Sequence, residues 1–103
     1  LHTDYSVSVL TPLEMVEAAV TRALFTDPET VLGKDERASV EMALRAVTSV
    51  AAFQLLSEHE IGSLEIGKLA DFVVLDIDPL TVEPGEIAGI RVLQTWVSGQ
   101  RAY

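Results

Sequence analysis

Hydrophobic residues recur at helical spacing near the start of the chain. Four apolar side chains lie three or four residues apart, namely Leu13, Val16, Val20 and Leu24. This spacing predicts a helix with one buried face. Residues 11–14 place a threonine cap, a proline at the first helical position and a glutamate three residues after the cap, which is the pattern of a helix start. We expect the helix to end at Asp27-Pro28.

A second helical pattern follows a polar segment. Residues 27–37 contain Pro28 and Gly33 and are predicted to form a loop. Ser39 can cap the next helix. Its buried stripe is expected to comprise Val40, Leu44, Val47, Ala51 and Leu55.

Beyond Glu60 the pattern changes to short apolar runs. Residues 70–76 are strand formers between acidic ends, which predicts a largely buried strand. A turn is expected around residues 83–87, then a strand over residues 90–97. Residues 98–100 predict a hairpin turn into the last three residues. Helices followed by strands of this kind predict an α+β fold.

Composition narrows the possible functions of these 103 residues. Hydrophobic residues make up 49%, which fits a globular protein, and a net charge of −9 argues against nucleic acid as a partner. The absence of cysteine excludes a disulfide framework and a thiolate zinc cage, and fits a cytoplasmic protein. No apolar run approaches about 18 residues, so no membrane partner is expected. A chain that opens on Leu1 suggests part of a longer protein.

Two segments of the C-terminal half form a recognisable pattern. Residues 61–76 are IGSLEIGKLADFVVLD, and residues 92–103 are VLQTWVSGQRAY. A Gly-Ser, then Gly-Lys-x-Ala-Asp with an apolar strand and a closing hairpin, resembles the C-terminal region of the amidohydrolase superfamily. Residues 39–48 are similar to that family's run into Thr-x-Asn-x-Ala, although Val50 stands where asparagine is usual.

The N-terminal segment narrows the resemblance to one branch. Residues 2–7, HTDYSV, are similar to the Ser-Asp-aromatic-Pro-Val segment of the N-substituted formamide deformylase-like branch, amidohydrolase family 3, with Thr3 for serine and Ser6 for proline. In that pattern the aspartate ends the eighth barrel strand. The resemblance therefore implies that Asp4 is catalytic and ligates a divalent metal, with zinc the expected ion.

The same resemblance implies an architecture. Two helices would come from the end of an incomplete (β/α)8 barrel, followed by a small, mostly antiparallel accessory sheet. Residues 1–57 would be the end of the catalytic barrel, and residues 58–103 a segment of the strand-rich accessory domain. The intact parent would hydrolyse carbon–nitrogen bonds other than peptide bonds. The isolated chain would be inactive and would bind no metal. Its expected partners are the rest of the barrel and a small amide-like substrate in the intact parent, and a second copy of the chain in a homo-oligomer.

Each candidate residue also has a structural explanation. An aspartate after a strand can simply cap a turn, which is the alternative for Asp4. His2 lies two residues earlier, so both side chains would point the same way on an extended strand, and we place it in the substrate pocket. We expect His59 to be solvated. Fold roles are expected for Lys68, Gly67 and Asp71, and a packing role for Trp96.

An alternative from another class is a free-standing structural or protein-binding α+β module without catalysis. Such a module would satisfy its own apolar faces. A fragment would instead expose an apolar patch where the missing strands pack, and would self-associate.

Overall fold

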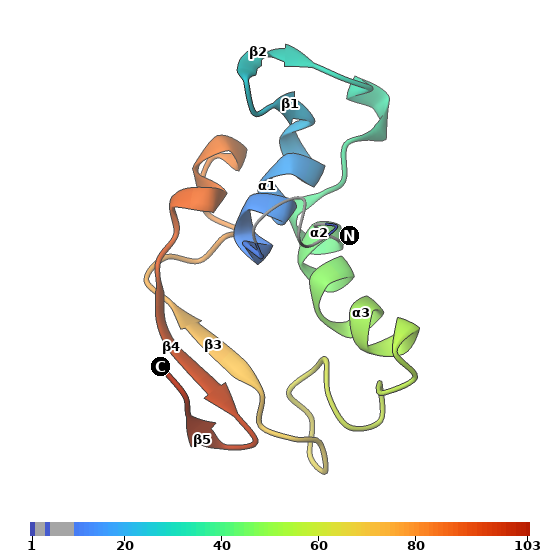
Figure 1. Cartoon of the computed structure of the whole chain (residues 1–103), viewed down its shortest axis with the longest axis vertical. Coiled ribbons are helices and arrows are strands. Elements are labelled where there is room, and N and C mark those ends of the chain that lie inside the picture. The colour runs from blue at the N-terminus through green and yellow to red at the C-terminus, as the bar shows by residue number, and fades with distance from the viewer. Residues whose placement is uncertain (2–3, 5–9) are drawn as a thin grey trace.

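The computed structural model describes residues 1, 4 and 10–103 and has an α+β architecture with two antiparallel sheets (Figure 1). The elements in chain order are helix α1 (Pro12–Thr21), strands β1 (Ala23–Leu24) and β2 (Asp27–Val31), 3-10 helix η1 (Lys34–Glu36), helices α2 (Val40–Val47) and α3 (Ser49–Gln54), strand β3 (Phe72–Leu75), 3-10 helix η2 (Pro84–Gly89), and strands β4 (Val92–Val97) and β5 (Gln100–Arg101). Within the described residues, no helix has the length and hydropathy that a membrane crossing requires.

Helix α1 begins where its cap predicts and ends earlier than expected. Thr11 is the N-cap and Pro12 opens the helix. The Thr11 hydroxyl donates to the Glu14 carboxylate at 2.7 Å. At the other end, Arg22 takes a left-handed conformation with φ 56° and its N–H bonds the Ala18 carbonyl. The predicted end at Asp27 is therefore wrong, because the chain turns out of the helix at Arg22.

The segment expected to be a loop contains a strand. Strand β2 pairs antiparallel with β1, and Ala23 lies opposite Val31. The Arg22 side chain closes this hairpin, since its Nε donates to the Leu32 carbonyl and its guanidinium lies 3.0 Å from the Glu36 carboxylate. The prediction of a loop over residues 27–37 is thus wrong for the first five of them. The Pro28 and Gly33 turn signals are local, so they could not reveal the hydrogen bond from Arg22 to Leu32, ten residues away, that holds the hairpin.

The second predicted helix is two helices with a break at Thr48. Ser39 caps α2 as predicted, accepting from the Met42 N–H at 3.1 Å. Thr48 has φ −123° and ψ −97°, and its hydroxyl donates to the Leu44 carbonyl at 2.8 Å. A β-branched residue that bonds the preceding turn in this way favours a local interruption. Leu55 follows the end of α3 and is exposed, so the buried stripe predicted for one continuous helix is wrong at that residue.

Strands β3, β4 and β5 form an antiparallel sheet in that order, as the sequence predicts. Phe72 lies opposite Trp96, and Val97 lies opposite Gln100. The turn between β4 and β5 has positive φ at both central residues, 51° at Ser98 and 75° at Gly99. This matches the tight hairpin turn expected there, whose twist suits the flanking strands.

Strand β3 is not buried as the apolar run predicts. Val73 is 51% exposed and Val74 is 36% exposed. These residues point to opposite faces of the sheet, so both faces are open to solvent. The prediction of a largely buried strand is therefore wrong for this chain by itself. To bury β3, other elements would have to cover both faces of the sheet, and the described residues do not do so.

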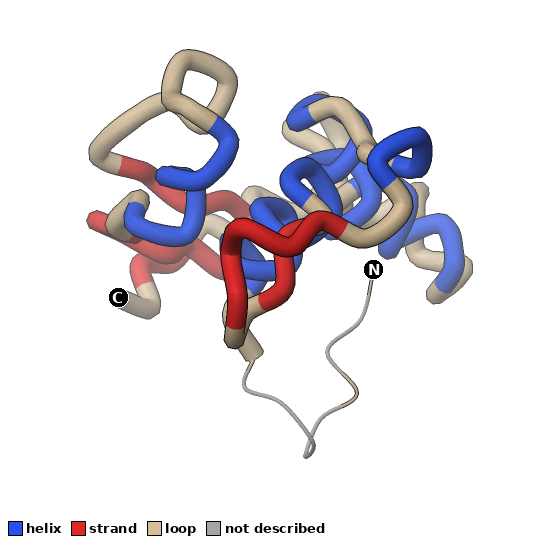
Figure 2. Tube along the Cα trace, turned by 90° about the horizontal axis from the view of Figure 1, so that it is seen from above, coloured by secondary structure: helices blue, strands red, loops and turns tan. Residues whose placement is uncertain are grey.

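The core lies where α1, α2 and η2 meet. Its buried residues come from both halves of the chain: Val16, Val20, Ala43, Ile87 and Ile90. The Ala88 N–H donates to the Glu17 carboxylate at 2.7 Å and ties η2 to α1. The three-stranded sheet lies to one side of α2 and α3 (Figures 1 and 2). The division into a barrel end (residues 1–57) and an accessory segment (residues 58–103) stays a prediction.

Candidate functional site

Asp4 is an exposed residue in a turn, with a positive φ of 52°. Aspartate tolerates this conformation better than most residues, so a turn role and a chemical role both remain compatible with the geometry. His2, the predicted substrate contact, lies outside the described residues. Asp4 is exposed here, and the catalytic and metal-binding roles predicted for it stay predictions.

A metal site needs more than Asp4. A catalytic zinc ion usually takes about three protein ligands. In the part of the chain that the structure describes, no group of three histidine, cysteine, aspartate or glutamate side chains is placed to hold a metal ion. These residues do not by themselves fit a complete metal centre, and no chemical step through a metal is derived for them.

The loop before β3 is held by a small polar cluster. The Ser63 hydroxyl donates to the Glu65 carboxylate at 2.5 Å, and the Lys68 ammonium donates to both, at 2.7 Å and 3.2 Å. The Ser63 hydrogen bond and the Lys68 contacts hold the pKa of Glu65 below its usual range. Gly67 completes the turn with φ 97°. All these contacts are local to the loop, which confirms the predicted fold roles of Gly67 and Lys68.

Asp71 also has the predicted fold role. Its carboxylate accepts from the Ser98 N–H at 2.7 Å, and the Gly99 N–H donates to the neighbouring Ala70 carbonyl at 3.0 Å. The start of β3 is thereby fixed to the turn between β4 and β5. The expectation for Trp96 is confirmed as well, because its ring stacks on Phe72 with centroids 5.6 Å apart.

A carboxylate that the sequence analysis did not single out joins the other ends of the same strands. Asp76 accepts from the Arg91 side chain at 2.8 Å and from the Arg91 N–H at 2.9 Å. The Arg91 hydrogen bonds lower the pKa of Asp76. In the sequence, Asp76 and Arg91 are only an acidic and a basic residue beside two predicted strands, and this does not show that they form an ion pair.

His59 lies outside this pair and is exposed, as predicted.

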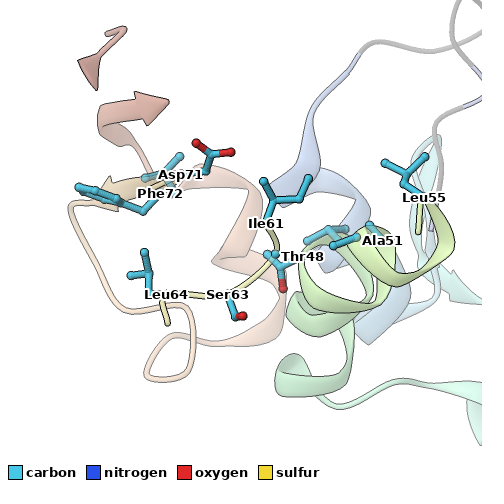
Figure 3. Close-up of a pocket in the computed structure, with 12 residues that line it drawn as sticks. Thr48, Ala51, Leu55, Ile61, Ser63, Leu64, Asp71 and Phe72 are labelled. Atoms are coloured by element: carbon cyan, nitrogen blue, oxygen red, sulfur yellow. The ribbon is translucent and has the colours of Figure 1, made fainter. Parts of the chain in front are cut away.

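Two cavities lie between the helices and β3. One has a volume of about 470 Å³, and its lining includes Ala51, Ile61, Ser63, Asp71 and Phe72 (Figure 3). The other has a volume of about 460 Å³ and lies between α1, α2 and the β3–β4 sheet. Three residues line both: Val47, Thr48 and Val73. The cavities therefore share a wall, and we call the two together the helix–sheet cleft.

The helix–sheet cleft is mostly apolar. Glu14 is the charged residue in the lining of one cavity, and Asp71 in the lining of the other. The Asp71 carboxylate is already engaged by the Ser98 amide. The cleft is therefore suited to packing against apolar groups and carries few groups that could take part in a reaction. In the sequence, the apolar run that forms β3 was the only indication of this cleft.

Comparisons with known proteins identify the family. The chain is 35% identical over 103 residues to N-substituted formamide deformylase of Arthrobacter pascens, and 34% identical over 103 residues to Protein LONG AFTER FAR-RED 3 of Arabidopsis thaliana. These alignments cover 100% of the chain but 19% and 17% of the two relatives. Imidazolonepropionase of Bacteroides fragilis is 38% identical over 65 residues, which is 63% of the chain and 15% of that relative.

The chain therefore spans less than a fifth of the length of its full-coverage relatives. No solved structure matches it. The model of the amidohydrolase family matches residues 1–103, the whole chain. On that match and those relatives, this chain belongs to the amidohydrolase family.

Proposed function

We propose that these 103 residues are the C-terminal portion of a metal-dependent hydrolase that acts on carbon–nitrogen bonds other than peptide bonds. The family match over the whole chain carries the proposal, together with the small share of each relative that the chain spans. The name of the Arthrobacter pascens relative makes N-substituted formamides the first substrates to test. A cytoplasmic location is part of the proposal and fits a cysteine-free sequence.

Asp4 is the residue that we propose for the chemistry. A carboxylate at the carboxyl end of a barrel strand lies on the face where such barrels hold their active sites. A bound divalent ion, zinc by expectation, would supply an acidified water and a polarised carbonyl. Asp4 would help to hold that ion and would accept a proton from the water. His2 would contact the substrate.

The rest of the (β/α)8 barrel is the partner that this proposal requires. A complete barrel takes about 200 residues or more, so most of the strands and most of the metal ligands would lie outside this chain. Large apolar side chains are exposed in several parts of the described fold, for example Phe25, Phe53 and Ile66. Such exposure favours a segment of a larger protein over a free-standing module that satisfies its own apolar faces.

The test uses the natural full-length protein that contains this chain. Its purified form should hydrolyse a carbon–nitrogen bond in a panel of N-monosubstituted formamides, measured as amine release. Asp4→Asn keeps the shape and removes the charge and basicity, so turnover should fall by about a hundredfold or more. Asp35→Asn, at another exposed aspartate, is the control and should leave turnover unchanged.

Two results would count against the proposal. Near-normal turnover of Asp4→Asn would remove Asp4 from the chemistry. Absence of any carbon–nitrogen hydrolysis by the metal-loaded full-length protein would contradict the proposed reaction. Separately, metal-dependent hydrolysis by the 103-residue chain would contradict the expected inactivity of the isolated segment.

A further inference from the structure

The hairpin of β1 and β2 presents a phenylalanine to solvent. Phe25 lies in the two-residue turn between the strands, and its side chain is 97% exposed. Leu24 and Leu32 nearby are exposed as well. This hairpin lies at the opposite end of the molecule from the three-stranded sheet (Figure 1), and none of its residues lines the helix–sheet cleft. It is therefore a separate apolar surface, of the kind that marks a contact with a partner.

Contacts within the chain hold the hairpin in one conformation. The Arg22 side chain donates to the Leu32 carbonyl and pairs with the Glu36 carboxylate, both at 3.0 Å. Farther along, the Arg37 Nε donates to the Thr21 carbonyl at the end of α1, also at 3.0 Å. Because these contacts fix the hairpin before any partner binds, association through it loses little conformational entropy.

The distribution of charge favours this end of the molecule for contact with a second copy. Residues 22–37 hold three of the seven lysine and arginine residues of the chain and four of its sixteen acidic residues, a net charge of −1. The other residues carry the remaining −8 of the total of −9. Two copies therefore repel each other least when they meet through their hairpins.

Lys34 is a cation that the described part of the chain does not engage. Six other lysine and arginine side chains each contact a carboxylate or a carbonyl of the chain: Arg22, Arg37, Arg45, Lys68, Arg91 and Arg101. Within the described residues, no ion pair involves Lys34 or Glu29, and both are exposed. One hairpin region thus offers an apolar tip, an unpaired cation and an unpaired carboxylate.

We propose that the β1–β2 hairpin is the contact between two copies of the full-length protein, related by a two-fold axis. Phe25 packs on the apolar hairpin residues of the second copy, and Lys34 of each protomer pairs with Glu29 of its partner. A two-fold axis makes each contact occur twice, so a single surface must carry both members of every pair, as this one does. The inference does not depend on the reaction proposed above.

The size of the surface sets the strength of the dimer. Residues 22–37 are fewer than the roughly 20 to 30 residues that each partner contributes to an interface of standard size. We therefore expect a reversible dimer that dissociates on dilution. The ion pairs across the contact are exposed at its rim, so added salt should weaken the dimer.

The experiment measures the dimer dissociation constant of the natural full-length protein by sedimentation velocity over a range of concentrations. Lys34→Glu and Glu29→Lys reverse the two charges singly, and the two variants are also mixed in equal amounts. Arg45→Glu is the control for Lys34→Glu, because it changes the net charge equally at an exposed residue of α2. Phe25→Ala tests the apolar tip, and maleimide labelling of Phe25→Cys, located by mass spectrometry, tests its exposure.

Each charge reversal should raise the dissociation constant at least tenfold, since both ion pairs become repulsive. The mixture should form a heterodimer whose dissociation constant is within threefold of the native value, because opposite charges face each other again. Phe25→Ala should also weaken the dimer at least tenfold, whereas Arg45→Glu should change it less than threefold. Labelling of Phe25→Cys should slow as the protein concentration rises.

Four results would overturn the proposal. The first is a monomer at every concentration. The second is a dimer that Phe25→Ala and the charge reversals leave unchanged, which would assign the contact to another surface. The third is a mixture that stays as weak as the single variants. The fourth is slow labelling of Phe25→Cys that does not depend on concentration, which would mean that the protein's own polypeptide covers the hairpin. Hydrolysis is measured separately, so an inactive dimer would contradict only the proposed function.

Discussion

Ile87 should contribute more to stability than any exposed apolar residue, although it lies in a short 3-10 helix. Its side chain is fully buried in the core cluster that also contains Val16 and Ala43, and its 3-10 helix packs on α1. Ile87→Ala removes about three methylene equivalents, worth about 0.8 kcal/mol each. With the cavity left behind, the free energy of unfolding should fall by about 3 to 4 kcal/mol. That is a large share of a total of about 5 kcal/mol, the low end for natural domains.

The assay is urea unfolding of the 103-residue chain, followed by far-UV circular dichroism at fixed protein concentration. Ile66→Ala is the matched control, because it is the same substitution at a fully exposed isoleucine. It should change the free energy of unfolding by no more than about 0.5 kcal/mol. A cost below about 1 kcal/mol for Ile87→Ala, at an unchanged denaturant slope, would refute the assignment of the core to α1, α2 and η2.

Three other perturbations test separate parts of the fold. Gly62→Ala should lower the free energy of unfolding in urea titration more than Gly67→Ala. Both positions have positive φ, but a Cβ at Gly62 would lie 2.5 Å from the Ala52 Cβ, whereas nothing lies within 4 Å of a Cβ at Gly67. Equal losses of stability would contradict this close approach. Arg91 lowers the pKa of Asp76, so this carboxylate stabilises the fold above its unfolded pKa of about 3.9 and loses that effect as pH falls through the folded pKa. The gap between the urea midpoints of the native chain and Asp76→Asn should therefore narrow below about pH 4, and a constant gap would count against the Asp76–Arg91 pair. Finally, the exposed apolar surface predicts that the isolated chain associates despite its charge, as a homodimer in the simplest case, and sedimentation that shows only monomer at high concentration would argue otherwise.

Local signals in the sequence determined where elements begin and turn. Thr11 and Ser39 mark the two helix starts, because both signals act within three residues: Ser39 accepts from the Met42 N–H, and the Thr11 hydroxyl donates to the Glu14 carboxylate. Residues 98–100 predict the hairpin, because its turn needs positive φ at two successive positions. The motif over residues 61–76 was enough to indicate the family that the comparisons show. The candidate site is less determined, since Asp4 comes from the resemblance and its role stays a prediction.

The tertiary structure alone decided where elements end and what they bury. Arg22 ends α1 through contacts with Leu32 and Glu36, ten and fourteen residues away, and no local pattern reveals such contacts. Ile87 enters the core against α1, seventy residues earlier, while Val73 stays exposed in a run with the same apolar character. An apolar side chain shows only that burial is favourable, because burial itself depends on which distant surfaces are present to pack against it.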